Sequence, residues 1–221
     1  MTRAEIRNLA RKRLGETTAA FWTDAELNSW IDDAGDDLAF KTKSIKANGL
    51  MTTTEDQAEY ILSTAYPNLL SVLEVYYYQN GTTWKKIKKT SRDELSITNP
   101  GWKSAESGTP IKFYWDKEED LIGFWVKPDS SNDGAYARVY YSRTYTDLAS
   151  DTAVPTLPEF LHKAQADYVV ARGYESRGYG DKSNNAWAQY YRRISEYLVE
   201  RRLEKQELED DNVMKNYRNI G

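Results

Sequence analysis

The chain has 221 residues, of which 40% are hydrophobic and 29% are charged, a balance typical of a folded globular protein rather than a disordered one. Its net charge of −4 gives no global positive field that would draw it onto nucleic acid or an anionic membrane. The absence of cysteine excludes disulfides, thiolate metal ligands and a cysteine nucleophile. No run approaches the roughly 20 apolar residues that span a bilayer, so no membrane partner is expected.

The sequence is rich in tyrosine and tryptophan, with 17 Tyr and 7 Trp against only 5 Phe. Both side chains combine a large contact area with a polar tip, so they suit surfaces that become buried only when a partner binds. Both also favour strands and fill β-rich cores. Composition alone leaves the two interpretations open.

Residues 1–50 are predicted to form two helices. The first carries apolar residues at helical spacing and ends near Gly15. The second begins at a capping box, in which Thr23 is the N-cap and Glu26 reaches back to its amide. Intervals of three, four and seven between its apolar residues place its end near Gly49. The residues of this apolar face are Leu27, Trp30, Ile31, Ala34, Leu38 and Ile45.

An acidic row lies off that apolar face. Like charges four residues apart destabilise a helix by about 0.2–0.5 kcal/mol per pair. Such a row is usually solvated, and the alternative is a contact with a basic partner. Its members are Asp32, Asp33, Asp36 and Asp37.

Residues 59–147 are predicted to form an antiparallel β-rich domain, either one sheet or a small sandwich. Asn80 and Gly81 supply the positive-φ positions of a tight hairpin. A polar loop is expected at residues 50–54 and a longer one at residues 92–109. The predicted strands are residues 60–62, 69–78, 83–89, 111–115, 121–127 and 136–145.

The strand predicted at residues 83–89 combines aromatic and basic side chains. Charges on an exposed edge strand discourage unwanted strand pairing. The same charges would suit an acidic neighbour or, alternatively, phosphate groups. The side chains concerned are Trp84, Lys85, Lys86, Lys88 and Lys89.

Residues 155–207 are predicted to form two further helices. Pro158 stands in the first turn of one, where its missing N–H costs nothing. Asp181 or Ser183 is the expected cap of the other. The acidic run at residues 204–211 opposes the helix dipole, so this last helix is expected to fray there.

Residues 208–221 are therefore predicted to form an extended tail, which cannot bury enough apolar surface to order itself alone. The expected fold class is α+β. Helices from the two ends of the chain pack as an α-helical bundle, an antiparallel β-rich middle is inserted between them, and the tail follows.

Candidate catalytic residues are scarce. His162 is the only histidine, so zinc sites and histidine-dependent nucleophilic sites have almost nothing to work with. The glycines form neither a Walker loop nor a dinucleotide fingerprint. The carboxylates at residues 116–120 are expected at a hairpin tip, where nothing excludes water. We therefore predict no catalytic residue, no metal site and no cofactor, and a protein that is not an enzyme.

The order of these elements resembles the head-to-tail adaptor (connector) family of tailed bacteriophages. Three segments carry the resemblance: LARKRLGETTAAFWTDAELNSWIDDAGDDLA at residues 9–39, YILSTAYPNLLSVLEVYY at residues 60–77 and VPTLPEFLHKAQADYVVARGYESRG at residues 154–178. Together they cover most of the chain. The loop at residues 92–109 departs from the family pattern.

This resemblance implies a structural virion protein. Such subunits form a homo-oligomeric ring, commonly of twelve copies, beneath the portal protein that closes the DNA-filled head. The other face receives the tail or the next neck protein, and the genomic DNA passes through the channel without sequence-specific binding. The implied location is the neck of the virion, after assembly in the host cytoplasm.

The resemblance also implies two sets of contact residues. The tail would bind the portal protein through Val213, Met214, Tyr217, Arg218 and Ile220. Contacts with a neighbouring subunit or the downstream partner would involve Trp84, Lys85, Lys86, Trp102 and Trp115.

Two other functions remain open at this stage. One is a carbohydrate-binding β module with helical extensions, in which Trp84, Trp102, Trp115 or Trp125 stack on sugars. The helices at both ends are superfluous to that function. The other is an enzyme of unfamiliar type that relies on Asp, Glu and Tyr alone.

Overall fold

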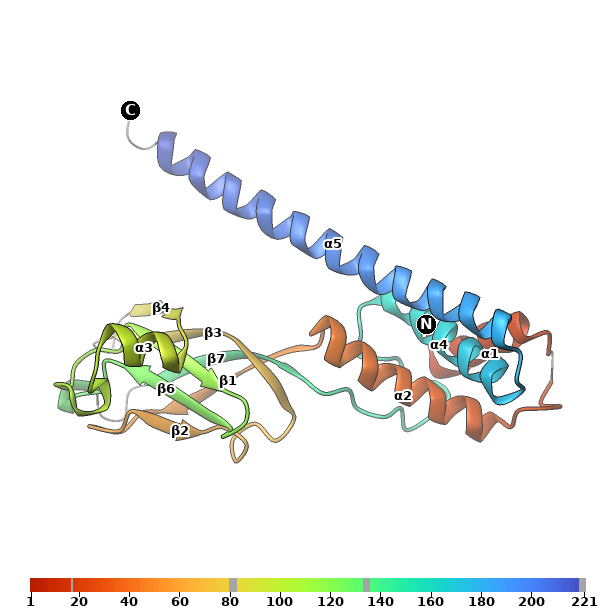
Figure 1. Cartoon of the computed structure of the whole chain (residues 1–221), viewed down its shortest axis with the longest axis horizontal. Helices are drawn as coiled ribbons and strands as arrows, with labels where there is room; N and C mark the ends of the chain where they lie inside the picture. The colour runs from red at the N-terminus through yellow and green to blue at the C-terminus, as the bar shows by residue number, and fades with distance from the viewer. Residues whose placement is uncertain (17, 80–82, 133–135, 219–221) are drawn as a thin grey trace. The chain divides into compact units, whose positions relative to one another are not determined.

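The computed structural model describes residues 1–16, 18–79, 83–132 and 136–218, with the backbone alone at residues 79, 132, 205 and 207–218. The chain divides into two compact units (Figure 1). Unit 1 contains Met1–Ser44 and Tyr145–Gly221, and unit 2 contains Ile45–Thr144. The predicted α+β class, with a β-rich part inserted between helical parts, is confirmed.

Unit 1 is a helical bundle built from α1 (Arg3–Leu14), α2 (Asp24–Thr42), α4 (Glu159–Ser176) and the first half of α5 (Gly180–Arg218). The capping box predicted at the start of α2 is present, and α1 begins with a second one. The core of the bundle is made of Ile6, Ala10, Leu27, Ile31, Leu38, Leu161, Ala164, Val169 and Tyr190, all fully buried.

The only histidine belongs to this structural core. His162 is 3% exposed, and its Nε2 donates to the Leu157 carbonyl at 3.0 Å. Its Nδ1 lies 2.9 Å from the amino group of Met1. Burial lowers the pKa of His162, so the neutral ring is favoured.

The end of α2 differs from the sequence prediction. The helix ends at Thr42, with Lys43 in the left-handed conformation (φ 49°), and the chain enters β1 (Lys46–Thr52) instead of continuing to Gly49. The ring of Tyr66 lies over Gly49 so closely that a Cβ there would overlap it. Pairing with the sheet therefore overrides the local helical pattern, and the loop predicted at residues 50–54 begins as strand.

Unit 2 contains one seven-stranded sheet in the order β1-β7-β3-β4-β5-β6-β2. Its strands are β1, β2 (Glu59–Ile61), β3 (Leu69–Gln79), β4 (Thr83–Lys89), β5 (Lys112–Asp116), β6 (Leu121–Trp125) and β7 (Tyr136–Arg143). The antiparallel pairings β3–β4 and β5–β6 are those expected of the two predicted hairpins. The predicted turn residues Asn80 and Gly81 lie outside the described residues. A short parallel pairing of β4 with β5 departs from the antiparallel expectation.

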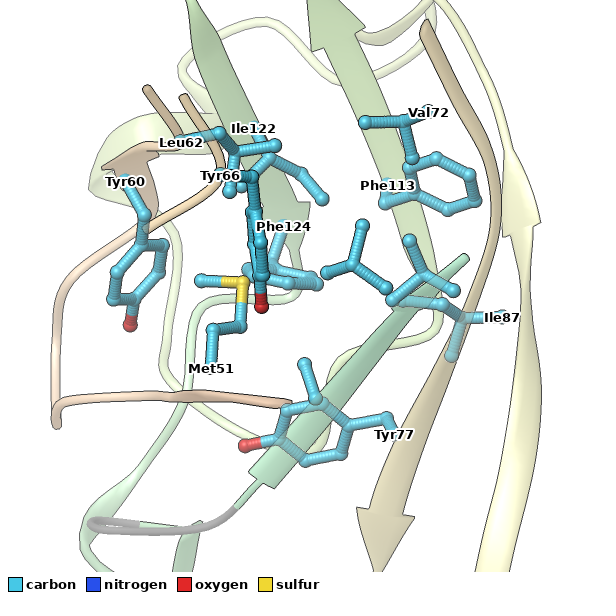
Figure 2. Close-up of a cluster of buried hydrophobic side chains, with 13 residues drawn as sticks. Met51, Tyr60, Leu62, Tyr66, Val72, Tyr77, Ile87, Phe113, Ile122 and Phe124 are labelled. Carbon is cyan, nitrogen blue, oxygen red and sulfur yellow. The ribbon is translucent and has the colours of Figure 1, made fainter. Parts of the chain in front are cut away.

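The sheet curls around the main core of unit 2 (Figure 2). All seven strands contribute to it, through side chains that include Met51, Tyr60, Val75, Tyr77, Ile87, Phe113, Phe124 and Val139. The hydroxyl group of Tyr77 lies 2.8 Å from that of Thr53. The hydroxyl of Tyr60 donates to the Gln57 carbonyl at 2.9 Å. Much of the aromatic surplus therefore fills the core, with the polar tips satisfied at its edges.

The loop predicted at residues 92–109 is partly helical. It contains α3 (Arg92–Thr98), whose N-cap Ser91 accepts from the amide of Glu94, and a short 3₁₀ turn at Trp102–Ser104. Leu95, Trp102 and Tyr114 form a second, smaller core beneath it. In the sequence, the signal for this packing was the presence of Leu95 and Trp102 within a mostly polar segment.

The structure also differs from the prediction at the C-terminus. Residues 208–218 are not an extended tail, because α5 remains helical to Arg218. The acidic run at residues 204–211 thus lies inside the helix and not in its last turn, where it would oppose the dipole most strongly. Its residue types are mostly good helix formers, and propagation adds one hydrogen bond per residue. Residues 219–221 lie outside the description.

Candidate functional site

The first candidate interaction surface is the C-terminal half of α5. The N-terminal half packs into unit 1 through buried Ala186, Tyr190 and Ile194. The hydroxyl of Tyr190 donates to Asp37 of α2, and the guanidinium of Arg201 donates to the Thr42 carbonyl at the end of α2, at 2.9 Å. Among the described side chains, Arg201 is the last on α5 to bond to another element of its unit.

Beyond this point α5 continues as a helix to Arg218, and its described side chains, at residues 202–204 and 206, form no bond to another element of unit 1 (Figure 1). Residues 202–218 span about 25 Å at 1.5 Å per residue. An isolated helix of this length is only marginally stable in water. Large exposed apolar side chains of α5 lie on both sides of this point, each between 39% and 55% accessible: Tyr191, Leu198 and Val199 precede Arg201, and Leu203 follows it. Clustered exposed apolar groups on such an element mark an interaction surface.

The residues predicted to bind the portal protein lie at the end of this helix. Val213, Met214, Tyr217 and Arg218 fall in its last turns. Their side chains, and all of Ile220, lie outside the described part of the chain. The structure therefore gives their position along α5 and no contact for them.

The second candidate surface is the outer face of the sheet in unit 2. Trp84 of β4 lies opposite Tyr78 of β3, with ring centroids 4.9 Å apart, and the Arg138 guanidinium of β7 lies 4.7 Å above the Trp84 ring. One row further along, the ring centroids of Tyr76 and Tyr140 are 5.5 Å apart. The face is completed by an ion pair of 2.5 Å between Lys86 and Glu74.

This face brings together only part of the predicted contact set. Trp84 and Lys86 share it, whereas Lys85 alternates to the other side of β4. Trp102 is 6% exposed and packs edge-on against Tyr114, so its side chain is part of a core and not of a contact surface. Trp115 is half-buried against the main core.

The sequence did not reveal the partners of Trp84 on this face. Tyr78 and Arg138 come from strands separated by about 60 residues, and only the register of β3 between β4 and β7 places them together. The available signal was the alternation of aromatic and charged residues along each strand. That alternation gives the face of a strand but not its neighbours.

A row of arginines fastens α1 to the rest of unit 1. Arg7 forms two bonds of 2.8 Å with the Asp151 carboxylate, and Arg11 bonds to Glu16 and Asp24 at 2.7 Å each. Arg7 and Arg11 are 8% and 5% exposed. The hydrogen bond to Arg7 lowers the pKa of Asp151. The sequence signal for this row was the four-residue spacing of Arg7 and Arg11 along α1. The pattern of apolar residues alone did not detect it.

Carboxylates near the predicted hairpin tip also have structural partners. Arg92 of α3 bonds to Glu119 at 2.9 Å and lies 3.3 Å from Glu59. Burial would raise the pKa of Glu59, but hydrogen bonds from Lys103 and Tyr114 outweigh burial and lower it. A lowered pKa keeps this carboxylate ionised and unsuited to donating a proton near neutral pH.

An acidic hollow of about 500 Å³ on unit 1 is lined by residues that include Asp32, Asp33, Asp36 and Asp147. Burial raises the pKa of Asp32 in this hollow. Burial, followed by repulsion from the neighbouring aspartates, raises the pKa of Asp36. Within the described residues, no group of three or more His, Asp or Glu side chains is arranged to hold a metal ion.

Comparison with known families identifies the chain. The model of the SU10 adaptor protein family matches residues 1–213, which include both units and most of α5. The chain belongs to the SU10 adaptor protein family. This is a family of bacteriophage head-to-tail adaptors, so the resemblance drawn from the sequence is confirmed. The comparison with curated proteins gave no match.

Membership gives the adaptor its general role. It is a structural phage protein of the virion neck, in a family whose members associate with portal and tail proteins. Its interaction surfaces, rather than a catalytic centre, are therefore the features that matter. Among the helices of the described residues, none is long and apolar enough to cross a membrane.

Proposed function

We propose that this adaptor assembles into a ring of twelve copies that docks beneath the portal protein. The ring completes the DNA-filled head and provides the platform for tail attachment. Assembly takes place in the host cytoplasm, and the ring remains in the neck of the virion. The isolated chain is a monomer or weak oligomer that assembles on the portal.

The observation that carries this proposal is the second half of α5, in which no described side chain after Arg201 bonds to another element of unit 1. A long helical segment of this kind, with exposed apolar side chains such as Val199 and Leu203, gains stability from a partner. The family supplies one in the portal protein. We assign the portal contact to the last turns of the helix and the residues that follow, through Val213, Met214, Tyr217, Arg218 and Ile220.

The outer sheet face of unit 2 is the proposed contact with a neighbouring subunit or the downstream tail or neck protein. Trp84 and Lys86 lie on it beside Tyr78 and Arg138. Partly exposed aromatic and arginine side chains are the types enriched in protein interfaces. Lys85 lies on the same strand, at its other side, and Trp102 is left out because it is buried.

Passage of the genomic DNA fits the charge of the chain. Proteins bind DNA largely because their positive charges release the counterions of the phosphates. A chain with a net charge of −4 has no overall positive charge to do this. The DNA is therefore expected to slide through the ring without sequence-specific binding.

Removal of the C-terminal residues tests the portal contact. A chain ending at Asp211 lacks all five assigned residues and is expected to lose portal binding while keeping its fold, because the packed half of α5 is intact. Pull-down on purified portal rings measures binding, and circular dichroism checks the fold. The control Leu50→Ser alters an exposed apolar side chain of unit 2 and should bind like the full chain. Undiminished binding by the truncated chain would contradict the assignment.

The carbohydrate-binding alternative loses its stacking platforms in the structure. Trp102 is buried, Trp115 packs against the main core, and one Trp84 face is occupied by Arg138. Trp125 lies against the small core under α3, near Lys112. A glycan screen followed by tryptophan fluorescence is expected to give no quenching.

A further inference from the structure

Two adjoining hollows on unit 1 form a groove beside the α4–α5 turn. The first, of about 250 Å³, lies between the end of α1, the segment before α2 and this turn, and the second, of about 600 Å³, follows α4 and α5. Tyr174 and Lys182 line both, so the two hollows adjoin at these side chains. Aromatic side chains stand exposed at the rim, with Phe21 66% and Tyr179 56% accessible.

Two cations are held in place over the aromatic rings of this groove. The Arg177 guanidinium lies 4.6 Å from the centre of the Phe21 ring and also donates to the Phe21 carbonyl at 3.2 Å. The Lys182 ammonium lies 5.5 Å and 5.4 Å from the centres of the Tyr174 and Tyr179 rings. Neither cation is within ion-pair distance of a carboxylate in the described part of the chain, and Arg177 has a longer-range attraction to Glu26. The rings fix both charges without neutralising them.

The carboxylates that line the groove are already neutralised. Glu16 is buried and bonded to Arg11 at 2.7 Å. Asp167 is held between Arg13 and Arg193. The groove therefore has an excess of positive charge beside exposed aromatic surface, a combination that fits an acidic segment with apolar residues.

The chain itself contains such a segment. Residues 204–211, EKQELEDD, carry five carboxylates against one lysine, together with Leu208. They belong to the part of α5 that follows Arg201, the last described side chain of the helix that bonds to another element of unit 1. On one helix, Lys182 and Glu207 are separated by about 38 Å at 1.5 Å per residue, so the segment cannot reach the groove of its own copy.

We propose that residues 204–211 of one copy dock in the aromatic and cationic groove of the next copy in the ring. This contact joins two different surfaces, which is the heterologous type that closes into a ring when the rotation per copy is right. The inference rests on the proposed ring only in that the ring brings the copies together.

Binding of a peptide tests the groove directly. A fluorescent peptide of residues 203–212 is expected to bind the full chain, and R177E/K182E should bind it at least about tenfold more weakly, because two attractive charges become repulsive. The control R172E/R192E makes the same change in net charge at two exposed arginines outside both hollows and should bind like wild type. Fluorescence anisotropy gives the affinities. Equal affinity for wild type and R177E/K182E overturns the proposal.

Disulfide trapping tests the contact between copies. The chain has no cysteine, so Lys182→Cys in one copy and Glu207→Cys in another introduce the only thiols. When the two variants are mixed on the portal under mild oxidation, they should form a disulfide-linked dimer. As a control, Lys182→Cys is mixed with Glu118→Cys, which lies at an exposed turn of unit 2, and this mixture should not form the dimer. Equal yields from the two mixtures overturn the proposal.

The groove contact and the proposed function can fail separately. If the wild-type chain forms a ring on the portal, and R177E/K182E assembles and binds the peptide equally well, the groove contact is overturned and the adaptor function stands. Absence of portal binding by the wild-type chain overturns the proposed function, and the peptide titration on the free chain then still decides the groove contact.

Discussion

Buried charge, and not only apolar packing, holds the first helix in place. Arg11 is 5% exposed, and Glu16 beside it is 6% exposed, so each charge depends on the other. Charges this deeply buried are stable only when paired and hydrogen-bonded. A sequence pattern of apolar residues cannot show this pairing, because Glu16 follows the helix and its partners lie across a turn.

Loss of one partner of this pair should be costly. Arg11→Ala leaves Glu16 uncompensated and is expected to lower the free energy of unfolding by about 3–5 kcal/mol. Combining it with Glu16→Gln removes the unpaired charge and should recover part of the loss. Urea unfolding followed by circular dichroism measures both. Arg172→Ala, at an exposed pair, should cost under about 1 kcal/mol. Similar losses for Arg11→Ala and Arg172→Ala would contradict the buried-pair account.

Because the pKa of Asp36 is raised, replacing its carboxyl group by a neutral one should stabilise the protein in a pH-dependent way. A carboxyl whose pKa is higher in the folded state than in the unfolded chain loses stability as the pH rises through the folded pKa, because the unfolded chain releases its proton more readily. Asp36→Asn should therefore raise the melting temperature at pH 7, and the gain should shrink as the pH falls from the raised pKa toward the ordinary value of 3.8 and be absent below it. A melting temperature at pH 7 equal to or below that of wild type would show that the charge carries no such cost.

At the scale of elements, the local signals predicted starts better than ends. The capping box at Thr23 and the pairing of β3 with β4 were predicted from short patterns, and the structure adds a second capping box at Thr2. The end of α2 depends on what lies across space, since Tyr66 fits over Gly49 in β1. The end of α5 was misjudged for a local reason, because the helix-forming residues of the acidic run outweigh its unfavourable charge. The outer sheet face was predicted only in part. Trp84 was identified from the sequence, but its neighbours could be identified only from the register of the strands.

The close packing of α2 makes its glycine sensitive. A Cβ at Gly35 would overlap the ring of Tyr145, so Gly35→Ala is expected to destabilise unit 1 by about 1–3 kcal/mol, although alanine is the better helix former. Gly180→Ala, at the start of α5 in open space, should be neutral or stabilising by up to about 1 kcal/mol. Thermal unfolding compares the two. An equal response of both variants would refute the packing argument.

At the scale of the whole molecule, the family could be identified from the sequence because its signature is the order of elements. Helices, a Thr-Asp-x-Glu-Leu helix start, a β-rich insertion and returning helices occur together in one order. The positions of the interaction surfaces could not be identified in the same way. The exposure of the second half of α5, and the cationic groove beside the α4–α5 turn, exist only once the bundle has formed.

Assembly of this adaptor as a ring on the portal protein can be observed by electron microscopy of the purified chain mixed with portal rings. Class averages are expected to show a second ring, with twelve-fold symmetry, beneath each portal. Bare portal rings beside free monomers, at adaptor concentrations well above those of the portal, would contradict it.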